Sequence, residues 1–415
     1  MYDELTQKLL RLRDALVILS SINTKEKNKA LKIIAEKIEK YRKEIILENS
    51  KDVEVAKIAG LRESLIDRLR LNDKRIDEMI NACYTVANLK DPVGEVVDSY
   101  TREDGLKIYK VRVPLGVIAI IYESRPNVTV ETTALALKSG NSILLKGGSD
   151  ALNSNKAIVK AIKEALSESL VPEHAVELVE STDRNVVDYI IKQNGLIDLV
   201  VPRGGKGLID YVIKNATVPV LETGAGVCHI FVDESADIEK SLKVVDNAKT
   251  QRPGTCNAVE TILVHKNIAA RFLPALKNLF DAKNVEIRGC EKTCQVINCI
   301  PATDQDWETE YLDLIVSVKV VESLDEAIEH IRKYSTNHSE AILTENYSNA
   351  MKFLNLVDSA AVYVNASTRF TDGGQFGMGA EIGISTQKLH TRGPVGLREL
   401  TTTKFIIFGD YHVRG

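Results

Sequence analysis

Apolar and charged positions alternate with helical spacing through the first 90 residues of the chain. The apolar positions that carry this pattern are Leu9, Leu16, Ile18, Leu31, Ile34 and Ile38. Asn23-Thr24 marks a break between two helices. Lysine, arginine and glutamate are interspersed on the other positions, which is typical of solvated helix faces. The pattern predicts a helical cover rather than a functional basic patch.

The pattern changes to two β-leaning runs at 95–100 and 106–113. They are joined by Arg102-Glu103-Asp104-Gly105, whose Asp-Gly step favours a hairpin turn. Near the other end of the chain, Thr401–Phe408 resembles a strand and has no obvious sheet partner. Because isolated β segments need partners, residues 95–114 and 400–410 are predicted to form an oligomerisation arm.

Between these segments, strand-like and helix-like runs alternate. The predicted strands are Gly116–Tyr122, Ser142–Lys146, Ala175–Val179 and Asp198–Val201. The predicted helices are Val128–Ser139, Ser154–Leu166, Asn185–Gln193 and Lys206–Lys214. A second alternating series runs from Val218 to about Val364. The alternation predicts an α/β fold with two doubly wound lobes, each built on a parallel sheet.

Length and composition narrow the class of protein. With 415 residues, of which 44% are hydrophobic, the chain can form two or three domains with sizeable cores. Its net charge of -4 gives no reason to expect a nucleic acid or a membrane surface as partner, so a small molecule is the expected substrate. No apolar run approaches roughly 18 residues, and Asp3 and Glu4 do not fit a secretory signal. We therefore expect a cytoplasmic protein.

The six cysteines are too sparse for a disulfide scaffold and are expected to be reduced thiols. Cys290, Cys294 and Cys299 cluster without a nearby histidine or a C-x-x-C pair. Ordinary packing is therefore expected there, and no metal site is predicted.

Cys256 differs from the other cysteines in its surroundings. It lies in the turn 251–257, between a predicted helix at Ile238–Lys249 and a predicted strand at Val259–Val264. Its neighbours are polar, and the guanidinium of Arg252 would favour the thiolate of a reactive cysteine. The pattern allows either a nucleophile presented to a cleft or an ordinary loop cysteine.

Four loops follow predicted strands, where an open parallel sheet binds its ligands. They are 123–127, 146–149, 202–206 and 222–226. Their glycines would let the backbone approach a pyrophosphate, and the helix opened by Gly204-Gly205 could hold an anion at its N-terminus. Tight βα turns are the alternative for any one loop. Neither G-x-G-x-x-G nor G-x-x-x-x-G-K-[ST] occurs, so a dinucleotide would need another set of loops.

These segments resemble a known family. The matching motifs are 113–118, 122–129, 145–149, 202–205, 251–257 and 393–397. Together they resemble the gamma-glutamyl phosphate reductases, a branch of the aldehyde dehydrogenase superfamily, over essentially the whole chain. The resemblance implies a cofactor domain at 1–94 and 115–226, a catalytic domain at 227–364 and a return segment near the active site at 365–399.

The family's reaction is the NADPH-dependent reduction of L-glutamate 5-phosphate to L-glutamate 5-semialdehyde in proline biosynthesis. The resemblance implies that Cys256 attacks the acyl phosphate and forms a thioester. Asn127 matches the superfamily's side-chain donor to the oxyanion, and the backbone N–H of Cys256 would be the second donor. An N-cap of the following helix is the alternative for Asn127.

The resemblance also implies the cofactor contacts. Lys146 matches the lysine that contacts the adenosine ribose, and Glu310 matches the glutamate that holds the nicotinamide ribose. Gly204 belongs to the glycine loops assigned to the cofactor. Where NAD-preferring relatives often carry a glutamate, this chain has Ser149, whose small hydroxyl would accommodate a 2′-phosphate. NADP(H) is therefore expected rather than NAD(H).

The substrate carries a phosphate, a carboxylate and an ammonium group, so cationic side chains are needed. The arginines in suitable polar segments are Arg125, Arg252, Arg369 and Arg392, each with a surface salt bridge as the alternative. Glu222 corresponds to the glutamate that helps activate water in hydrolytic aldehyde dehydrogenases, which a reductase does not need, and the flanking segment 221–226 departs from the superfamily pattern. Both binding of the substrate ammonium and structural pairing stay open for Glu222. His229 and His390 are more simply read as structural histidines.

Two rival functions remain at this stage: an aldehyde dehydrogenase of another specificity, such as a coenzyme A-acylating enzyme, and a cofactor-binding scaffold without catalysis. Retention of both Cys256 and Asn127 speaks against the scaffold. We also expect a homo-oligomer and an association with the glutamate 5-kinase that supplies the labile acyl phosphate.

Overall fold

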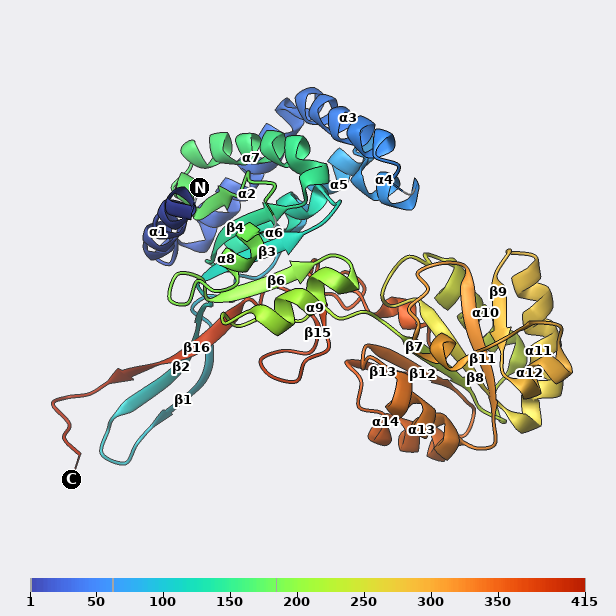
Figure 1. Cartoon of the computed structure of the whole chain (residues 1–415). Helices are drawn as coiled ribbons and strands as arrows, with labels where there is room; N and C mark the ends of the chain where they lie inside the picture. The colour runs from blue at the N-terminus through green and yellow to red at the C-terminus, as the bar shows by residue number, and fades with distance from the viewer. Residues whose placement is uncertain (1, 62, 184, 415) are drawn as a thin grey trace. The chain divides into compact units, whose positions relative to one another are not determined.

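The computed structural model describes residues 2–61, 63–183 and 185–414, which form two compact units (Figure 1). The first unit comprises Met1–Thr223, Gly377–Gly383 and Val395–Gly415. The second comprises Gly224–Phe376 and Ile384–Pro394. The predicted return segment 365–399 is thus divided between the two units.

The first unit contains a four-stranded parallel sheet in the order β5-β4-β3-β6. Its strands are β3 (Val117–Tyr122), β4 (Ser142–Gly147), β5 (Val176–Leu178) and β6 (Leu199–Arg203). Every residue of β3 and β4 is buried, as expected of parallel strands covered on both faces. The α/β fold predicted for this lobe is confirmed.

Nine helices of the described residues belong to the first unit. They are α1 (Tyr2–Leu19), α2 (Thr24–Lys40), α3 (Arg42–Ile58), α4 (Glu63–Leu69), α5 (Asp73–Asn88), α6 (Asn127–Lys138), α7 (Leu152–Ser167), α8 (Asn185–Ile190) and α9 (Lys206–Asn215). The predicted break at Asn23-Thr24 is the start of α2, where the Asn23 side chain accepts a hydrogen bond from the backbone N–H of Glu26. Ile18 was predicted to join the apolar stripe, but it is 53% exposed.

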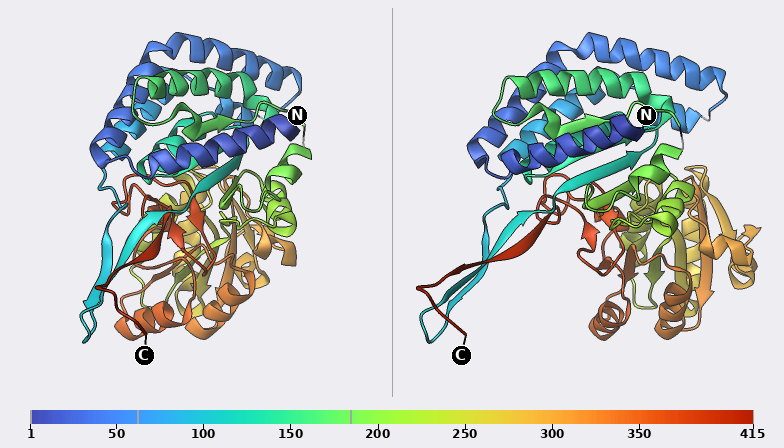
Figure 2. Two further views of the ribbon diagram at one scale, coloured as in Figure 1. Left: turned by 90° about the vertical axis from the view of Figure 1, so that its left-hand side faces the viewer. Right: turned by 60° about the vertical axis from the view of Figure 1, so that its left-hand side comes forward.

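Helices cover both faces of this sheet. Ile118 and Ile120 of β3 pack in one buried cluster with residues of α2, α5, α6 and α7. Val117, Ala119 and Ile121 point to the opposite face and pack with α1, α8 and α9. Figure 2 shows the dark-blue helix α1 beside the strands of this sheet in both views. The helical cover predicted for the N-terminal residues is therefore part of this lobe.

The second unit contains a seven-stranded parallel sheet in the order β10-β9-β11-β8-β7-β12-β13. Its strands are β7 (Cys228–Val232), β8 (Val259–His265), β9 (Glu286–Gly289), β10 (Ile300–Pro301), β11 (Ile315–Val321), β12 (Ser339–Leu343) and β13 (Ala361–Val364). Its helices are α10 (Ile238–Thr250), α11 (Lys266–Asp281), α12 (Glu291–Val296), α13 (Leu324–Tyr334) and α14 (Tyr347–Leu356). Two buried clusters lie on its faces, so the second α/β lobe is confirmed.

The second alternating series of strands and helices begins later in the chain than predicted. Val218 and Val220 belong to the first unit, where Val200 of β6 exchanges backbone hydrogen bonds with Pro219 and Leu221. This segment adds a single bridge to the edge of the first sheet instead of opening the second. The parallel strands of the second unit begin at Cys228.

Thr401–Phe408, for which the sequence offered no partner, is strand β16. It pairs antiparallel with β2 (Lys107–Pro114) along its whole length, from Thr401 opposite Pro114 to Phe408 opposite Lys107. On its other side, β2 pairs with β1 (Val96–Thr101) as the predicted hairpin. All residues of β1 are exposed, as are Phe405, Ile407 and Phe408. The oligomerising role of this sheet stays a prediction.

Short elements complete the described chain. They are the 3-10 helices η1 (Ser149–Ala151), η2 (Glu173–Ala175), η3 (Asp304–Glu308) and η4 (Thr368–Phe370) and the paired strands β14 (Ile384–Ser385) and β15 (Gly393–Pro394). Among the described residues, no helix combines the length and the apolar character needed to span a bilayer.

Candidate active site

Cys256 lies in the loop between α10 and β8, as the sequence predicted. It is half-buried and in no disulfide bond. The loop is closed by the Thr255 hydroxyl, which donates to the carbonyl oxygen of Arg252 at 2.8 Å and to Oδ1 of Asn257 at 3.0 Å. The nucleophile candidate is therefore carried by an ordered turn at one end of a buried strand.

The buried side chain of Asn257 joins this loop to the segment around η4. Its Nδ2 donates to the carbonyl oxygen of Thr371 at 2.9 Å, and its Oδ1 accepts from Nη1 of Arg369. The Thr368 hydroxyl donates to the Asn257 carbonyl oxygen at 2.7 Å. Residues about a hundred positions apart in the sequence are thus held together.

Arg369 is consequently held beside the loop that carries Cys256, and its Nε also donates to Oε1 of Gln251 at 2.9 Å. Burial lowers the pKa of Arg369, the nearby Arg252 guanidinium lowers it further, and Cys256 raises it. Two neighbouring guanidinium groups repel each other unless an anion lies between or beside them. The structure therefore brings together three predicted residues, Cys256, Arg252 and Arg369, in an arrangement suited to an anionic substrate.

The backbone of Cys256 is packed against the start of β7. A Cβ placed on Gly226 would lie 1.5 Å from the Cys256 carbonyl oxygen, so only glycine fits there. The same oxygen accepts a hydrogen bond from the thiol of Cys228 at 3.1 Å. Oε1 of Glu310 accepts from the backbone N–H of Gly226 at 2.7 Å. Sequence reasoning missed Gly226 and Cys228 in this role, because no local motif links them to Cys256.

Asn127 is the first residue of α6, and Pro126 occupies the N-cap position. The alternative that Asn127 caps this helix is therefore wrong. Its Nδ2 donates to Oε1 of Glu131, one turn further along α6, at 2.9 Å. Burial raises the pKa of Glu131, while Asn127, Arg203 and Arg125 oppose the rise. The amide of Asn127 is thus oriented by a carboxylate that the sequence analysis did not single out.

Lys146 lies near the carboxyl end of β4, where its Nζ donates to the carbonyl oxygen of Gly147 at 2.8 Å. Burial lowers the pKa of Lys146, and the neighbouring Asp150 carboxylate raises it. Ser149 is exposed at the start of η1. Asp150, which the sequence analysis overlooked, accepts from the hydroxyl of Ser124. A lysine and a carboxylate therefore flank Ser149.

The N-terminus of α9, predicted to hold an anion, holds a side-chain carboxylate. The backbone N–H of Gly205 donates to Oε2 of Glu123 at 2.9 Å. A Cβ on Gly204 would lie 2.4 Å from the same oxygen, so a larger residue there would displace the Glu123 side chain. The sequence analysis placed Glu123 in one of the four loops, but it could not show where its side chain points.

The remaining candidates lie in different surroundings. Arg392 donates through Nη1 to Oδ1 of Asp358 at 2.6 Å, which agrees with the salt-bridge alternative. His229 is buried, with its Nδ1 3.0 Å from Oε2 of Glu340. His390 is exposed. Glu222 is half-buried in the first unit, and both roles considered for it stay open.

The clustered cysteines are packed through local contacts. Sγ of Cys290 lies 3.3 Å from the Thr293 hydroxyl, and the Cys294 thiol donates to the carbonyl oxygen of Gly289 at 3.5 Å. In the part of the chain that the structure describes, no group of three or more His, Cys, Asp or Glu side chains could hold a metal ion.

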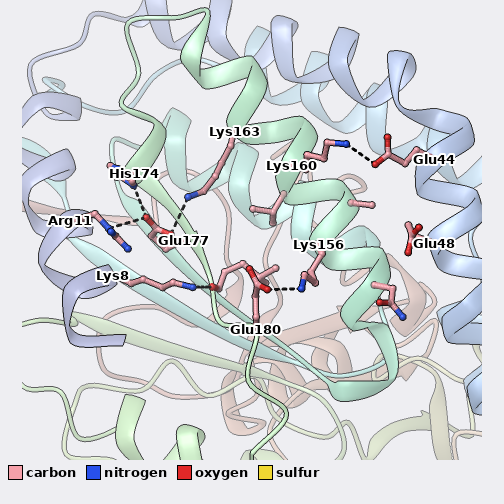
Figure 3. Close-up of a pocket in the computed structure, with 14 residues that line it drawn as sticks. Lys8, Arg11, Glu44, Glu48, Lys156, Lys160, Lys163, His174, Glu177 and Glu180 are labelled. Carbon is pink, nitrogen blue, oxygen red and sulfur yellow. Dashed lines mark hydrogen bonds and ion pairs between the residues drawn. The ribbon is translucent and has the colours of Figure 1, made fainter. Parts of the chain in front are cut away.

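A cavity of about 540 Å³ lies among α1, α3, α7 and β5 of the first unit (Figure 3). Most of its charged side chains pair with one another. The buried Glu177 carboxylate accepts from Lys163 at 3.1 Å and lies 2.7 Å from Nδ1 of His174. Lys156 and Glu180 form a second ion pair at 2.6 Å. None of the predicted site residues lines this cavity.

Comparison with known families identifies the class of protein to which this fold and this cysteine loop belong. Residues 13–296 match the model of the aldehyde dehydrogenase family. The chain belongs to this family, and the superfamily expected from the sequence motifs is confirmed.

The family can be defined more narrowly. The chain is 66% identical over 413 residues to gamma-glutamyl phosphate reductase of Thermotoga maritima, which covers 99% of this chain and 100% of that protein. The crystal structure of that protein matches with a TM-score of 0.97 over 99% of this chain and 100% of that one. The gamma-glutamyl phosphate reductase of Saccharomyces cerevisiae is 33% identical, with a TM-score of 0.55 over 99% and 98% of the two chains. This chain belongs to the gamma-glutamyl phosphate reductases.

A more distant match supports the fold alone. An engineered glycolyl-CoA reductase with bound NADP+ is 15% identical, with a TM-score of 0.69 over 97% of this chain and 96% of that one. The aldehyde dehydrogenase architecture therefore persists at low sequence identity.

Proposed function

We propose that this chain reduces L-glutamate 5-phosphate to L-glutamate 5-semialdehyde and phosphate, with NADPH as reductant, in L-proline biosynthesis. The observation that carries the proposal is the 66% identity to a gamma-glutamyl phosphate reductase over the full length of both chains. The grouping of Cys256 with Arg252 and Arg369 supports it, because a cysteine nucleophile beside two guanidinium groups suits an acyl phosphate. Coenzyme A-acylating activity is not favoured, because the relatives that are 66% identical over the full chain are gamma-glutamyl phosphate reductases.

The first unit has residues that fit a nicotinamide dinucleotide. Lys146 is a buried cation at the end of a parallel strand, where such sheets bind their ligands. Ser149 offers an exposed hydroxyl next to it, and Gly204 keeps the neighbouring turn tight. The dinucleotide bound to the distant glycolyl-CoA reductase is NADP+. We assign Lys146, Ser149 and Gly204 to the cofactor, and Glu310 of the second unit to its nicotinamide ribose.

The chemistry begins at the sulfur of Cys256. The thiolate attacks the acyl carbon of the substrate, an S–C bond forms, and the C–O bond to phosphate breaks. Arg252 and Arg369 neutralise the departing phosphate. By the family resemblance, Nδ2 of Asn127 and the backbone N–H of Cys256 are assigned as donors to the oxyanion of the tetrahedral intermediate. The product of this stage is a thioester on Cys256.

When bound, reduced NADP would supply the hydride that reduces the thioester carbon, and Lys146, Ser149, Gly204 and Glu310 would hold the cofactor. The residues of the oxyanion hole stabilise the resulting alkoxide of the thiohemiacetal. Collapse of this species breaks the S–C bond, releases the aldehyde and restores the Cys256 thiolate. Arg125 is assigned to the substrate carboxylate, which a planar guanidinium can bind through two parallel hydrogen bonds.

The reverse reaction tests the proposed function directly. The purified protein is mixed with L-glutamate 5-semialdehyde and NADP+, and NADPH formation is followed by its absorbance with and without inorganic phosphate. We expect NADPH formation only when phosphate is present, because phosphate must release the acyl group from Cys256. NADPH formation that does not depend on phosphate but requires coenzyme A would overturn the proposal in favour of an acylating dehydrogenase.

Arg369→Lys should weaken use of the acyl phosphate. Lysine keeps the charge but loses the planar fork that contacts Gln251 and Asn257, so kcat/KM is expected to fall about 10- to 100-fold. Steady-state kinetics with saturating NADPH measure the change. The control is Arg288→Lys, which alters an arginine of the same unit that pairs with Glu286 and Asp306. Equal losses in both variants would argue against a substrate contact for Arg369.

Ser149→Glu should change the preference between cofactors. A carboxylate at this position adds to the charge of Asp150 and would repel a 2′-phosphate, so the KM for NADPH is expected to rise about tenfold more than the KM for NADH. Parallel titrations of the two cofactors measure this difference. Ser149→Gln, which has nearly the same size without the charge, is the matched control. A similar rise for both cofactors would contradict the assignment of NADP(H).

Assembly and location are further parts of the proposal. The exposed apolar side chains Phe405, Ile407 and Phe408 support a role of the β1-β2-β16 sheet as a homo-oligomerisation arm. The lability of an acyl phosphate supports association with the glutamate 5-kinase that would supply it. A role in amino-acid biosynthesis supports a cytoplasmic location.

A further inference from the structure

The peptide group that follows the proposed nucleophile is held from behind by the start of β7. Gly226 packs so closely against it that a Cβ would lie 2.5 Å from the carbonyl carbon of Cys256 and 3.0 Å from its Cα. The thiol of Cys228 donates to the Cys256 carbonyl oxygen at 3.1 Å. These two residues therefore contact the main chain of Cys256 rather than its side chain.

Gly226 is fixed by its own partners. Its N–H donates to Glu310 at 2.7 Å, and the next N–H along the chain, that of Val227, donates to the Thr336 hydroxyl at 3.0 Å. The segment then continues as β7, whose residues are all buried. A segment anchored through two successive N–H groups and continued by a buried strand can hold the Cys256 peptide in one orientation.

Cys228 is suited to donate a hydrogen bond to the carbonyl oxygen of Cys256. Its side chain is fully buried, and burial raises the pKa of its thiol well above the ordinary value, with nearby carboxylates and Cys256 acting in the same direction. The thiol therefore keeps its proton, and only the protonated form can donate to a carbonyl oxygen. The second thiol beside the active cysteine is a hydrogen-bond donor and not a second nucleophile.

We propose that Gly226, Cys228 and Glu310 form a clamp that fixes the backbone of Cys256 and thereby aims its sulfur and its N–H at the substrate. Cys228 and Glu310 are positioning residues in this proposal. Gly226 packs against both the carbonyl carbon and the Cα of Cys256, so the clamp fixes the place of that Cα, from which the sulfur and the N–H both project. Reaction rates depend steeply on such alignment. The clamp rests on the proposed function only for the role of Cys256 as nucleophile.

The clamp also gives Glu310 a second task. One carboxylate oxygen, Oε1, accepts from Gly226, and this contact is separate from the assignment of Glu310 to the nicotinamide ribose. Effects of Glu310 on the nucleophile should therefore be visible without any cofactor.

The test compares Cys228→Ala, which removes the donor, with Cys228→Ser, which restores one. Two quantities are measured: kcat, and the rate at which iodoacetamide alkylates Cys256 without substrate or cofactor, followed by mass spectrometry of the Cys256 peptide. One lost hydrogen bond of about 1 kcal/mol corresponds to roughly a fivefold change, so Cys228→Ala should lower both rates about fivefold and leave the KM for NADPH unchanged. Cys228→Ser should recover at least half of each loss, and Cys290→Ala controls for loss of another thiol in the same unit.

Rates in Cys228→Ala within twofold of the unaltered protein, or equal losses in the alanine and serine variants, would overturn the clamp. If Cys228→Ala does not fold, Glu310→Gln and Glu310→Ala test the same idea from the Gly226 side. Glutamine keeps Oε1 as an acceptor, so only the alanine variant should slow alkylation in the absence of cofactor. Because alkylation needs no substrate, it distinguishes failure of the clamp from failure of the proposed reaction, which the phosphate assay reports.

Discussion

Cys256→Ala is expected to abolish reduction of the acyl phosphate while NADPH still binds. The variant has no sulfur to form the thioester, so kcat should fall roughly 10⁴-fold or more. The residues assigned to the cofactor's adenosine part, Lys146 and Ser149, belong to the other compact unit and are untouched by the substitution. The dissociation constant for NADPH should therefore change less than about twofold, which fluorescence titration can measure.

The control for this experiment is Cys294→Ala, which removes a half-buried thiol elsewhere in the second unit. It should keep the activity of the unaltered protein. Substantial turnover in Cys256→Ala would remove the thiol mechanism altogether. Loss of both turnover and NADPH binding, with unchanged thermal unfolding, would show that the cofactor contacts have been assigned to the wrong residues.

Local sequence patterns were sufficient to predict most strands and helices of the two lobes. Continuous apolar runs such as Val117–Tyr122 predict buried parallel strands because both faces of the sheet are covered by helices. Polar turns rich in glycine and proline separate them, so each element ends close to its predicted boundary. The one misplaced boundary, at Val218–Val220, is a short apolar run whose hydrogen bonds go to Val200 of the preceding strand. A run of three residues has too little pattern to show which sheet it joins.

Contacts between distant segments could not be predicted in the same way. Thr401–Phe408 was identified as a strand, but its register against Lys107–Pro114 depends on backbone hydrogen bonds that carry no side-chain signal. Glu123 and Asp150 each follow a predicted strand, yet the sequence does not show that one reaches Gly205 and the other Ser124. Side-chain direction in loops is set by the packed structure.

In the candidate site, too, single residues could be predicted from the sequence, whereas the contacts between distant residues could not. Cys256 was predicted as the nucleophile because its polar turn is unusual for a cysteine, and the family motif points to it independently. The grouping of Arg369 with that turn depends on the buried amide of Asn257, 112 positions away in the sequence. An asparagine next to a cysteine is common, so nothing local marks it as the link. Single-residue chemistry is therefore readable from the sequence, whereas the network that orients it requires the fold.

Gly226→Ala should have the second-largest effect on activity, although Gly226 touches neither substrate nor cofactor in the proposed mechanism. The added Cβ would lie 1.5 Å from the carbonyl oxygen of Cys256, and the atoms on both sides of this contact belong to the backbone. The loop that carries Cys256 must therefore move. A displacement of about 1 Å at a reacting group costs about 10²-fold, so kcat should fall by roughly that factor while the KM for NADPH changes little.

Gly207→Ala is the matched control, because Gly207 lies within α9 with nothing within 4 Å of an added Cβ. There, alanine should keep the activity and stabilise the helix by up to about 1 kcal/mol, seen as a higher thermal unfolding midpoint. Iodoacetamide alkylation of Cys256 should slow in Gly226→Ala and not in Gly207→Ala. A Gly226→Ala protein with kcat within a few-fold of the unaltered enzyme would mean that the loop that carries Cys256 tolerates displacement, and that the close packing behind Cys256 does not govern its reactivity.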